Sequence, residues 1–326
     1  MIVPLLTLVI STILCGLYLL AARRLQLLDQ PNERSSHQQP TPHGGGAPLF
    51  LAFSFGVAVA ALWWDIWTPP YLLMMMLALV LMLLGVVDDF RELSVRLRMT
   101  LYGLVALLMS AYLLQPVFGG ALLLAASVFW GLVLLWSLNL FNFMDGIDGI
   151  AATQCVLACG SAALLAWVGG GHSAYALFCL LLAAAHLGFL AWNWPPARLF
   201  MGDAGSVPTG FLLASMALLG WVEGQLNPLC WLVLLAAFVT DASLTLLWRM
   251  ASGQPFTQPH RSHAYQRLSR HLGSHLAVDM GLVALNGLWL FPLAWGVQIW
   301  PKFGFLLVIL AYLPLVWGMA KVHKLA

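Results

Sequence analysis

Long apolar runs alternate with short polar segments along this chain, and the length of the runs predicts the fold. A transmembrane helix needs roughly 20 predominantly apolar residues to cross about 30 Å of hydrocarbon. Runs of this kind cover residues 1–22, 47–64, 70–87, 99–116, 120–138, 150–168, 174–192, 206–222, 228–248, 276–296 and 302–320. We therefore predict an all-α, polytopic membrane helix bundle of about 11 transmembrane helices, formed by residues 1–326 as a single integral membrane domain.

The composition supports this prediction. Hydrophobic residues make up 62% of the chain and charged residues only 8%, which leaves no segment for a large soluble domain. No basic segment precedes the first run, and no convincing small-residue cleavage site follows it. We expect a retained helix there, not a cleaved signal peptide.

The lysines and arginines predict the orientation of the bundle, because they accumulate in short cytoplasmic loops. One set of loops carries every lysine and arginine except Lys302, while the opposite loops are short and carry Asp65 and Glu223. We expect the amino terminus outside and the carboxyl terminus in the cytoplasm. The loops predicted at the cytoplasmic face are residues 23–46, 88–98, 139–149, 193–205 and 249–275.

Carboxylates lie at the ends of predicted spans, where an unpaired charge is costly unless it is hydrated, paired or bound to a metal. Asp88 and Asp89 directly follow the third run, and Asp203 lies just before the eighth. Two adjacent carboxylates repel each other and need a cation or an arginine nearby. Alone, each group is also explained as a helix cap. Because all of them are predicted at one membrane surface, we treat them as candidates for catalysis or metal binding.

The third loop has the most specific pattern, since Asn139, Asn142, Asp145 and Asp148 recur every three residues. If this stretch is helical, consecutive members share a face. Oxygen ligands of this kind suit Mg²⁺, which takes one or two carboxylates together with substrate phosphate and water. With Asp203, the pattern predicts a magnesium site, for which Mn²⁺ is the alternative ion.

The first and fifth loops carry candidate groups for binding an anion. The residues concerned are His37 and His43 in the first loop and His260, Arg261 and His263 in the fifth. Arginine and protonatable histidine suit a diphosphate. The alternatives are an ordinary polar loop and a basic loop beside anionic lipid. Asp241, within the ninth run, either approaches this site or pairs with Arg249.

Carboxylates for a metal and cations for phosphate groups suit phosphoryl transfer, which depends on positioning and charge neutralisation. A site embedded in the membrane implies that one substrate is a lipid. The sequence thus predicts an enzyme that joins a water-soluble phosphate donor to a lipid phosphate at the cytoplasmic face.

The ordered motifs resemble one known family over nearly the whole chain. They are Asp88-Asp89, Asn139 to Asp148, Gly202-Asp203-Ala-Gly-Ser206, the Pro-Thr41-Pro-His43-Gly run and the histidine-bearing last loop. This set is similar to that of the polyprenyl-phosphate N-acetylhexosamine-1-phosphate transferases, which transfer a sugar phosphate from a UDP-sugar to a polyprenyl phosphate and release UMP. The family fold, a bundle of about ten or eleven transmembrane helices, agrees with the hydrophobic pattern.

The resemblance implies a role for each candidate residue. Catalytic roles are implied for Asp88, Asp89 and Asp148, metal binding for Asn142, Asp145 and Asp203, and substrate binding for His37, His43, Asn139, His260, Arg261 and His263. In this assignment Asp88 acts on the lipid phosphate with support from Asp89, and Arg261 contacts the sugar diphosphate.

One difference from the family pattern narrows the range of donor substrates. The branch of the family that uses the muramyl-pentapeptide donor carries three consecutive histidines in the last loop, whereas this chain has His260-Arg261-Ser262-His263. The pattern looks more like the bacterial branch that starts O-antigen or related surface-polysaccharide synthesis, and hence like a multi-pass protein of the bacterial inner (cytoplasmic) membrane. The implied partners are undecaprenyl phosphate and a UDP-N-acetylhexosamine of the GlcNAc, FucNAc or QuiNAc type.

Other classes of protein fit less well. A transporter or flippase for an anionic solute or lipid would also use charges in the membrane, but near the midplane and commonly with repeat symmetry. The charges here lie at one predicted surface, and we find no internal repeat. We expect membrane lipid as a partner and no nucleic acid; a homodimer is left open.

Overall fold

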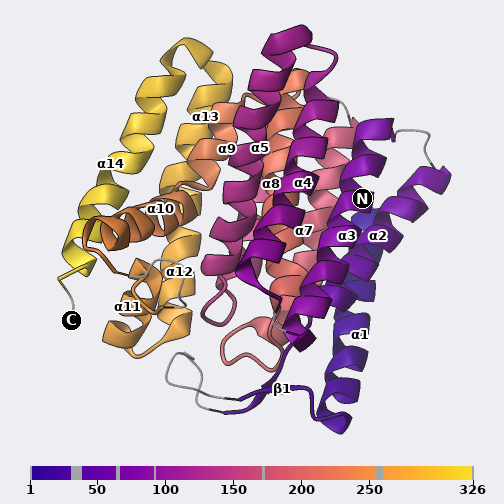
Figure 1. Cartoon of the computed structure of the whole chain (residues 1–326), viewed down its shortest axis with the longest axis vertical. Coiled ribbons are helices and arrows are strands. Elements are labelled where there is room, and N and C mark those ends of the chain that lie inside the picture. The colour runs from indigo at the N-terminus through magenta and orange to yellow at the C-terminus, as the bar shows by residue number, and fades with distance from the viewer. Residues whose placement is uncertain are drawn as a thin grey trace.

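The structure is a membrane helix bundle, as the hydrophobic pattern predicts (Figure 1). It is a computed structural model that describes residues 2–30, 39–63, 67–91, 93–170, 173–254 and 260–324. Within these residues 10 helices are long and apolar enough to cross a membrane, and one bent helix pair raises the number to 11 if it counts as a single span.

The long helices follow the predicted runs closely. They are α1 (Ile2–Arg24), α2 (Gly46–Trp63), α3 (Pro69–Arg91), α4 (Val95–Leu114), α5 (Gly120–Phe143), α6 (Ile150–Val168), α7 (Ser173–Asn193), α8 (Asp203–Val222) and α14 (Gly304–Val322). One more span consists of α12 (His275–Leu285), the π-helical turn η1 (Asn286–Leu290) and α13 (Phe291–Ile299), and the short η2 (Pro301–Phe303) leads into α14.

Helix α8 lies at the centre of the bundle. Every residue from Ala204 to Gly220 is buried, and α3 and α5 pack along it, with α2 and α4 making smaller contacts. A helix that is apolar on all sides requires such an environment. Because Asp203 is the first residue of α8, the packing of the central helix also determines where this carboxylate lies.

The predicted span at residues 228–248 is bent. The chain forms α9 (Pro228–Leu234) and α10 (Ala236–Ala251), which meet at an angle of 71°. Helix α9 is short and apolar, whereas α10 buries Asp241, Thr245 and Arg249 at intervals of four residues on one face. A polar face of this kind requires hydrogen-bonding partners. The start of α11 (Ala264–Leu272) supplies two backbone donors to Asp241, and Gln254 and Ser262 accept from Arg249.

The first loop is not helical, as its glycines and prolines predict, but it contains a small hairpin that the sequence did not indicate. Strand β1 (Leu28–Asp29) pairs antiparallel with β2 (Thr41–Pro42). The Phe200 N–H donates to the Pro42 carbonyl over 2.8 Å, and the Gly45 N–H donates to the Phe200 carbonyl over 2.9 Å. The first loop is therefore joined to the segment that precedes α8.

Candidate functional site

The segments with the predicted site residues gather at one end of the bundle, which we call the site end. In Figure 1 the hairpin with β1, the connections before α6 and α8, and helix α11 all lie at the lower end of the view. The first, fourth and fifth loops thus come together with the end of α5, although up to about 200 residues separate them in sequence.

Three carboxylates, which we call the acidic cluster, lie where α3 meets α8: Asp88, Asp89 and Asp203. Arg98, in the first turn of α4, forms ion pairs with Asp88 and, at 3.3 Å, with Asp203. Asn142 on α5 donates from Nδ2 to Asp203 Oδ1 over 2.7 Å. Helices α3 and α8 carry the three carboxylates, while α4 and α5 supply their partners Arg98 and Asn142. The cluster therefore results from helix packing.

Glycines permit the close approach of α3 and α8. A Cβ added at Gly85 on α3 would lie 2.5 Å from the backbone nitrogen of Ala204. Gly202, just before α8, has a φ of 72°, and a Cβ there would lie 2.7 Å from Asp89 Oδ2. Larger residues at these positions would separate the carboxylates of the two helices.

Asp89 supports the start of α8. Its Oδ1 accepts a hydrogen bond from the Asp203 backbone N–H over 3.2 Å, while α8 has no side-chain cap of its own. A carboxylate at a helix N-terminus also interacts favourably with the helix dipole. The other oxygen, Oδ2, is buried without a hydrogen-bond partner among the described residues. The cluster therefore retains unsatisfied negative character.

Asp145 lies beside the acidic cluster, in the loop after α5. Burial of its carboxylate and the proximity of Asp203, Asp89 and Asp148 raise its pKa well above the usual range. Within the described residues, no hydrogen bond or ion pair of the Asp145 side chain is found. Charges arranged in this way favour a bound cation.

The donor set fits Mg²⁺ but does not enclose it. The described residues contain no group of three or more His, Cys, Asp or Glu side chains placed to hold a metal ion. Asp145 and Asp203 offer carboxylate oxygens, and Mg²⁺ commonly completes its coordination with waters and substrate phosphate. Asn142 turns its amide nitrogen toward Asp203, so its metal-binding role stays a prediction.

The third loop does not align its four polar residues on one helix face. Helix α5 ends at Phe143, and the chain turns through Gly146 and Gly149 before α6 begins. Asn139 donates to the Leu135 carbonyl within α5 over 2.7 Å. The stretch is helical only as far as Phe143, so the condition for a shared helix face is met by Asn139 and Asn142 and not by Asp145 and Asp148.

Asp148 faces a different part of the fold from Asp145. Its Oδ2 accepts a hydrogen bond from the Ala197 N–H over 3.0 Å and lies 3.2 Å from Nδ1 of His275, the first residue of α12. Asp148 thus connects the third loop to the fourth loop and to the C-terminal helices. Its predicted catalytic role is untested by this arrangement.

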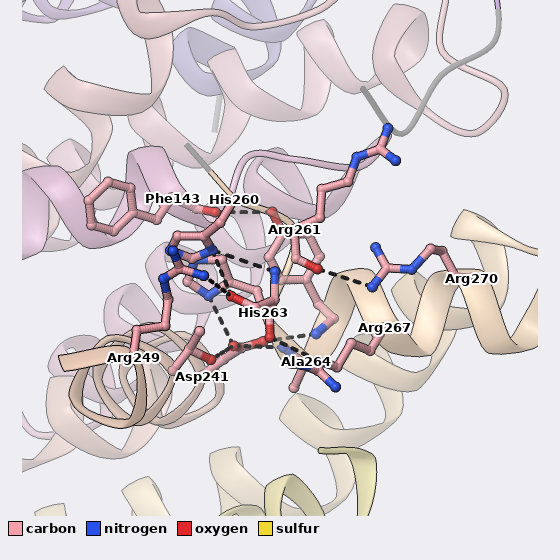
Figure 2. Close-up of polar contacts among 12 residues, drawn as sticks. Phe143, Asp241, Arg249, His260, Arg261, His263, Ala264, Arg267 and Arg270 are labelled. Atoms are coloured by element: carbon pink, nitrogen blue, oxygen red, sulfur yellow. Dashed lines mark hydrogen bonds and ion pairs between the residues drawn. The ribbon is translucent and has the colours of Figure 1, made fainter. Parts of the chain in front are cut away.

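The fifth loop forms what we call the basic segment, residues 260–270, which is organised around Asp241 (Figure 2). The Asp241 carboxylate lies 3.1 Å from His263 Nδ1 and accepts hydrogen bonds from the backbone N–H groups of Ala264 and Tyr265, each over 2.9 Å. Of the two roles left open for Asp241, contact with the site is the one observed.

The basic segment carries permanent positive charge on its arginines. Burial, His263 and Arg249 together lower the pKa of His260 to about 4, so its imidazole is neutral near pH 7. Arg261 has a buried Nε with no hydrogen-bond partner among the described residues. Burial and the adjacent Arg261 and Arg267 lower the pKa of Arg270. This concentration of cations without a carboxylate in the loop suits an anionic ligand.

Tyr265 of the basic segment packs against the third loop beside Asp145. Its hydroxyl donates to the Phe143 carbonyl over 3.0 Å and lies against Gly146, where a Cβ would collide with it. Burial, together with Asp241 and Asp145, raises the pKa of Tyr265. Tyr265 is therefore close enough to interact electrostatically with both Asp145 and Asp241.

Of the two candidate histidines in the first loop, the structure describes His43. His43 lies near the acidic cluster, with its ring 6.2 Å from that of Phe90, the residue after Asp89. The Tyr18 hydroxyl donates to the His43 carbonyl over 2.9 Å and holds this turn. His37 lies outside the described residues.

Asp279 is a buried carboxylate outside the predicted site residues. It lies on α12, one turn after His275, and is fully buried with both carboxylate oxygens lacking a partner among the described residues. Its Oδ2 lies against Gly149, where a Cβ would approach to 2.6 Å. A lone acid within an apolar run was the available signal.

Comparison with known proteins gives consistent matches. The model of glycosyl transferase family 4 matches residues 71–221. The chain is 28% identical over 265 residues to a probable undecaprenyl-phosphate N-acetylglucosaminyl 1-phosphate transferase of Bacillus subtilis (strain 168), covering 78% of this chain and 73% of that protein.

Two further relatives are also named as transferases of sugar phosphates. An undecaprenyl-phosphate alpha-N-acetylglucosaminyl 1-phosphate transferase of Escherichia coli (strain K12) is 28% identical over 267 residues, covering 76% of this chain and 71% of that protein. A phospho-N-acetylmuramoyl-pentapeptide-transferase of Shouchella clausii (strain KSM-K16) is 31% identical over 241 residues, covering 65% of this chain and 72% of that protein.

Proposed function

This chain belongs to the polyprenyl-phosphate N-acetylhexosamine-1-phosphate transferases of glycosyl transferase family 4, and we propose that it transfers an N-acetylhexosamine 1-phosphate from a UDP-sugar to undecaprenyl phosphate. The general reaction, transfer of a sugar 1-phosphate to a polyprenyl phosphate, follows from the family. The UDP donor, the N-acetylated sugar and a role at the start of O-antigen or surface-polysaccharide assembly are the further parts of the proposal.

One observation carries the proposal: the acidic cluster and the basic segment lie at the same end of a membrane bundle, and Tyr265 of the basic segment packs beside Asp145. Burial and the neighbouring carboxylates raise the pKa of Asp145, which lies beside the cluster, and Arg261 has a buried donor atom without a partner among the described residues. A divalent cation would satisfy the first group and a diphosphate the second. A metal-bound UDP-sugar supplies both kinds of charge in one ligand.

In the proposed reaction, an oxygen of the lipid phosphate attacks the phosphorus atom that bears the sugar. The bond from this phosphorus to the bridging oxygen breaks, and UMP leaves with that oxygen. Mg²⁺, held by Asp145 and Asp203, would offset the charge of the donor diphosphate. Mn²⁺ is the alternative ion.

The residues of the chain have distinct tasks in this proposal. Asp88 orients the lipid phosphate or accepts its proton, and Arg98 and the Leu93 N–H hold the Asp88 carboxylate in place. Asp89 fixes the start of α8 and therefore the position of Asp203. Arg261 stabilises the charge that develops on the phosphate oxygens as the bond breaks.

Purified protein in lipid nanodiscs tests this function. With a panel of UDP-N-acetylhexosamines, we expect UMP release that requires both undecaprenyl phosphate and Mg²⁺ or Mn²⁺. The muramyl-pentapeptide donor serves as the contrasting substrate, and we expect it to be inactive. Movement of an anionic lipid across the bilayer without UMP release would instead support a transporter or flippase and overturn the proposal.

The proposal also places the site end in the cytoplasm, where UDP-sugars are made. Cysteines at Ser94 and Ser262, near the acidic cluster and within the basic segment, should be shielded from an impermeant thiol reagent in intact cells. A cysteine at Gly170, in the loop after α6 at the opposite end, should react. Labelling of the first two from outside would reverse the orientation and contradict the proposed access to the donor.

A further inference from the structure

A single carboxylate organises the start of α11, and none of the sequence motifs identifies it. Asp241 is buried in α10. Its Oδ1 accepts from Thr245 Oγ1 at 3.1 Å and from the Ala264 N–H at 2.9 Å, and it lies 3.1 Å from His263 Nδ1. Its Oδ2 accepts from the Tyr265 N–H at 2.9 Å. One side chain thus receives four donors, three of them from the basic segment.

Two of these bonds replace a helix cap. His263 occupies the N-cap position of α11 and makes no side-chain cap hydrogen bond. The first N–H groups of a helix have no partner within it, and a carboxylate is a favourable acceptor for them. Because Asp241 belongs to a different helix, it fixes both the first residue of α11 and the distance between α11 and α10.

The bond to His263 determines which ring nitrogen remains available. A carboxylate beside Nδ1 favours the imidazole form that carries its proton on Nδ1. No hydrogen bond of Nε2 to another described residue is found. The His263 ring stacks with His260 at 4.9 Å and with Tyr265 at 5.8 Å, and lies 6.3 Å from the Phe143 ring. The ring plane is therefore fixed, and Nε2 is its only nitrogen without a partner in the described chain.

We propose that Asp241 is a positioning residue that holds His263 with Nε2 directed to the phosphate groups of the donor. This inference rests on the proposed function. When His263 is neutral, Nε2 can accept a hydrogen bond from a hydroxyl or water. When His263 is protonated, Nε2 donates to a phosphate oxygen. In Figure 2, Asp241 and Phe143 lie on opposite sides of His263.

An asparagine at Asp241 tests the arrangement, because one amide cannot replace two acceptor oxygens. If its oxygen faces His263 and Ala264, its NH₂ group opposes the Tyr265 N–H; if it is turned, it opposes the other donors. We expect Asp241→Asn to lower kcat by about 10- to 100-fold with a smaller change in KM for the UDP-sugar, and Asp241→Glu to recover part of the loss. The matched control, Thr240→Val, changes the preceding buried residue of α10 and should keep wild-type kcat.

A double-mutant cycle separates positioning from general stabilisation. If Asp241 acts through His263, the variant Asp241→Asn/His263→Gln should lose no more turnover than His263→Gln alone. Additive losses would overturn the inference. Absence of UMP release by the wild-type protein would instead contradict the proposed function, so the two failures can be distinguished.

Nitrogen-15 NMR of histidine-labelled wild-type protein provides a test that needs no folded Asp241 variant. We expect the neutral form of His263 to carry its proton on Nδ1, with the signal assigned by its loss in His263→Gln. A proton on Nε2 would overturn the inference even if Asp241→Asn failed to fold.

Discussion

The acidic cluster and the basic segment hold their charged groups in place by different means. Asp88 and Asp203 belong to helices separated by more than 100 residues, and Arg98 joins them from a third helix. The basic segment is a short stretch of chain in which His263, Ala264 and Tyr265 all bind Asp241. The first arrangement depends on how whole helices pack, whereas the second depends on one buried side chain.

The two regions also differ in how their charge is balanced. Arg98 is shared by two carboxylates of the acidic cluster, while Asp89 retains a buried oxygen without a partner among the described residues. Beside the basic segment, the Asp241 carboxylate already accepts hydrogen bonds from nearby donors. Arg261 Nε has no partner among the described residues. Opposite uncompensated charges at adjoining positions suit a ligand that carries both a cation and a diphosphate.

The largest effect should follow from removing charge beside and within the acidic cluster. Asp145→Asn and Asp203→Asn should each lower turnover by at least about 100-fold at limiting Mg²⁺, because each loses a charged metal ligand. Steady-state UMP release measures this. The control is Glu223→Gln, which removes a carboxylate at the opposite end of the bundle, where Glu223 accepts a hydrogen bond from Tyr71. Near-normal activity of either aspartate variant would remove that residue from the metal site.

A smaller and more selective effect is expected in the basic segment. Arg261→Ala should weaken charge-assisted hydrogen bonds worth roughly 1.5–3 kcal/mol, about 10- to 150-fold in kcat/KM. The loss should be found when the UDP-sugar is varied at saturating lipid phosphate. Arg96→Gln, at an exposed arginine of the first turn of α4, is the control. A change confined to the lipid-phosphate dependence would assign the basic segment to the other substrate.

A larger distance between α3 and α8 should lower turnover by displacing the carboxylates of the acidic cluster. Gly85→Ala would place a Cβ 2.5 Å from the Ala204 backbone nitrogen and push α3 away from α8. We expect about a tenfold lower turnover, since a displacement of about 1 Å can be costly at an active site, together with a lower unfolding temperature. Gly160→Ala, on α6, has no atom within 4 Å of the added Cβ and should leave both quantities unchanged or slightly raise stability. Equal behaviour of the two variants would argue against tight α3–α8 packing as the origin of the cluster.

The smallest effect concerns the acid stability of the basic segment. The pKa of His260 is lowered from 6.5 to about 4, so between these values the unfolded chain binds a proton that the folded chain does not. Stability should therefore fall as the pH drops from about 6.5 toward 4, and this contribution is absent above that window. His260→Gln should reduce the fall, measured as the unfolding temperature in detergent at several pH values. The control is His271→Gln, which removes an exposed histidine of α11 and should leave the loss of stability at low pH unchanged. An equal change in both variants would contradict the assignment to His260.

Most of the fold was predictable from the sequence, because a membrane imposes a minimum length on each apolar run. The exception at α9 and α10 is instructive. Hydropathy alone shows one run of adequate length, but the polar residues Asp241, Thr245 and Arg249 share a face of α10 and require partners. After the 71° bend, Asp241 bonds the start of α11 and Arg249 bonds Gln254 and Ser262, and these partners cannot be read from hydropathy.

The candidate site was predictable as a set of residues and not as a geometry. The sequence determined which carboxylates and cations occur at the ends of the spans, since charged residues are rare enough in this chain to be conspicuous. It could not determine that Asp89 supports the helix of Asp203, that Asp148 turns toward His275, or that Asp241 holds His263. These pairings depend on contacts between helices distant in sequence, and helix-to-helix approach is decided by packing and by glycine positions that local sequence patterns do not reveal.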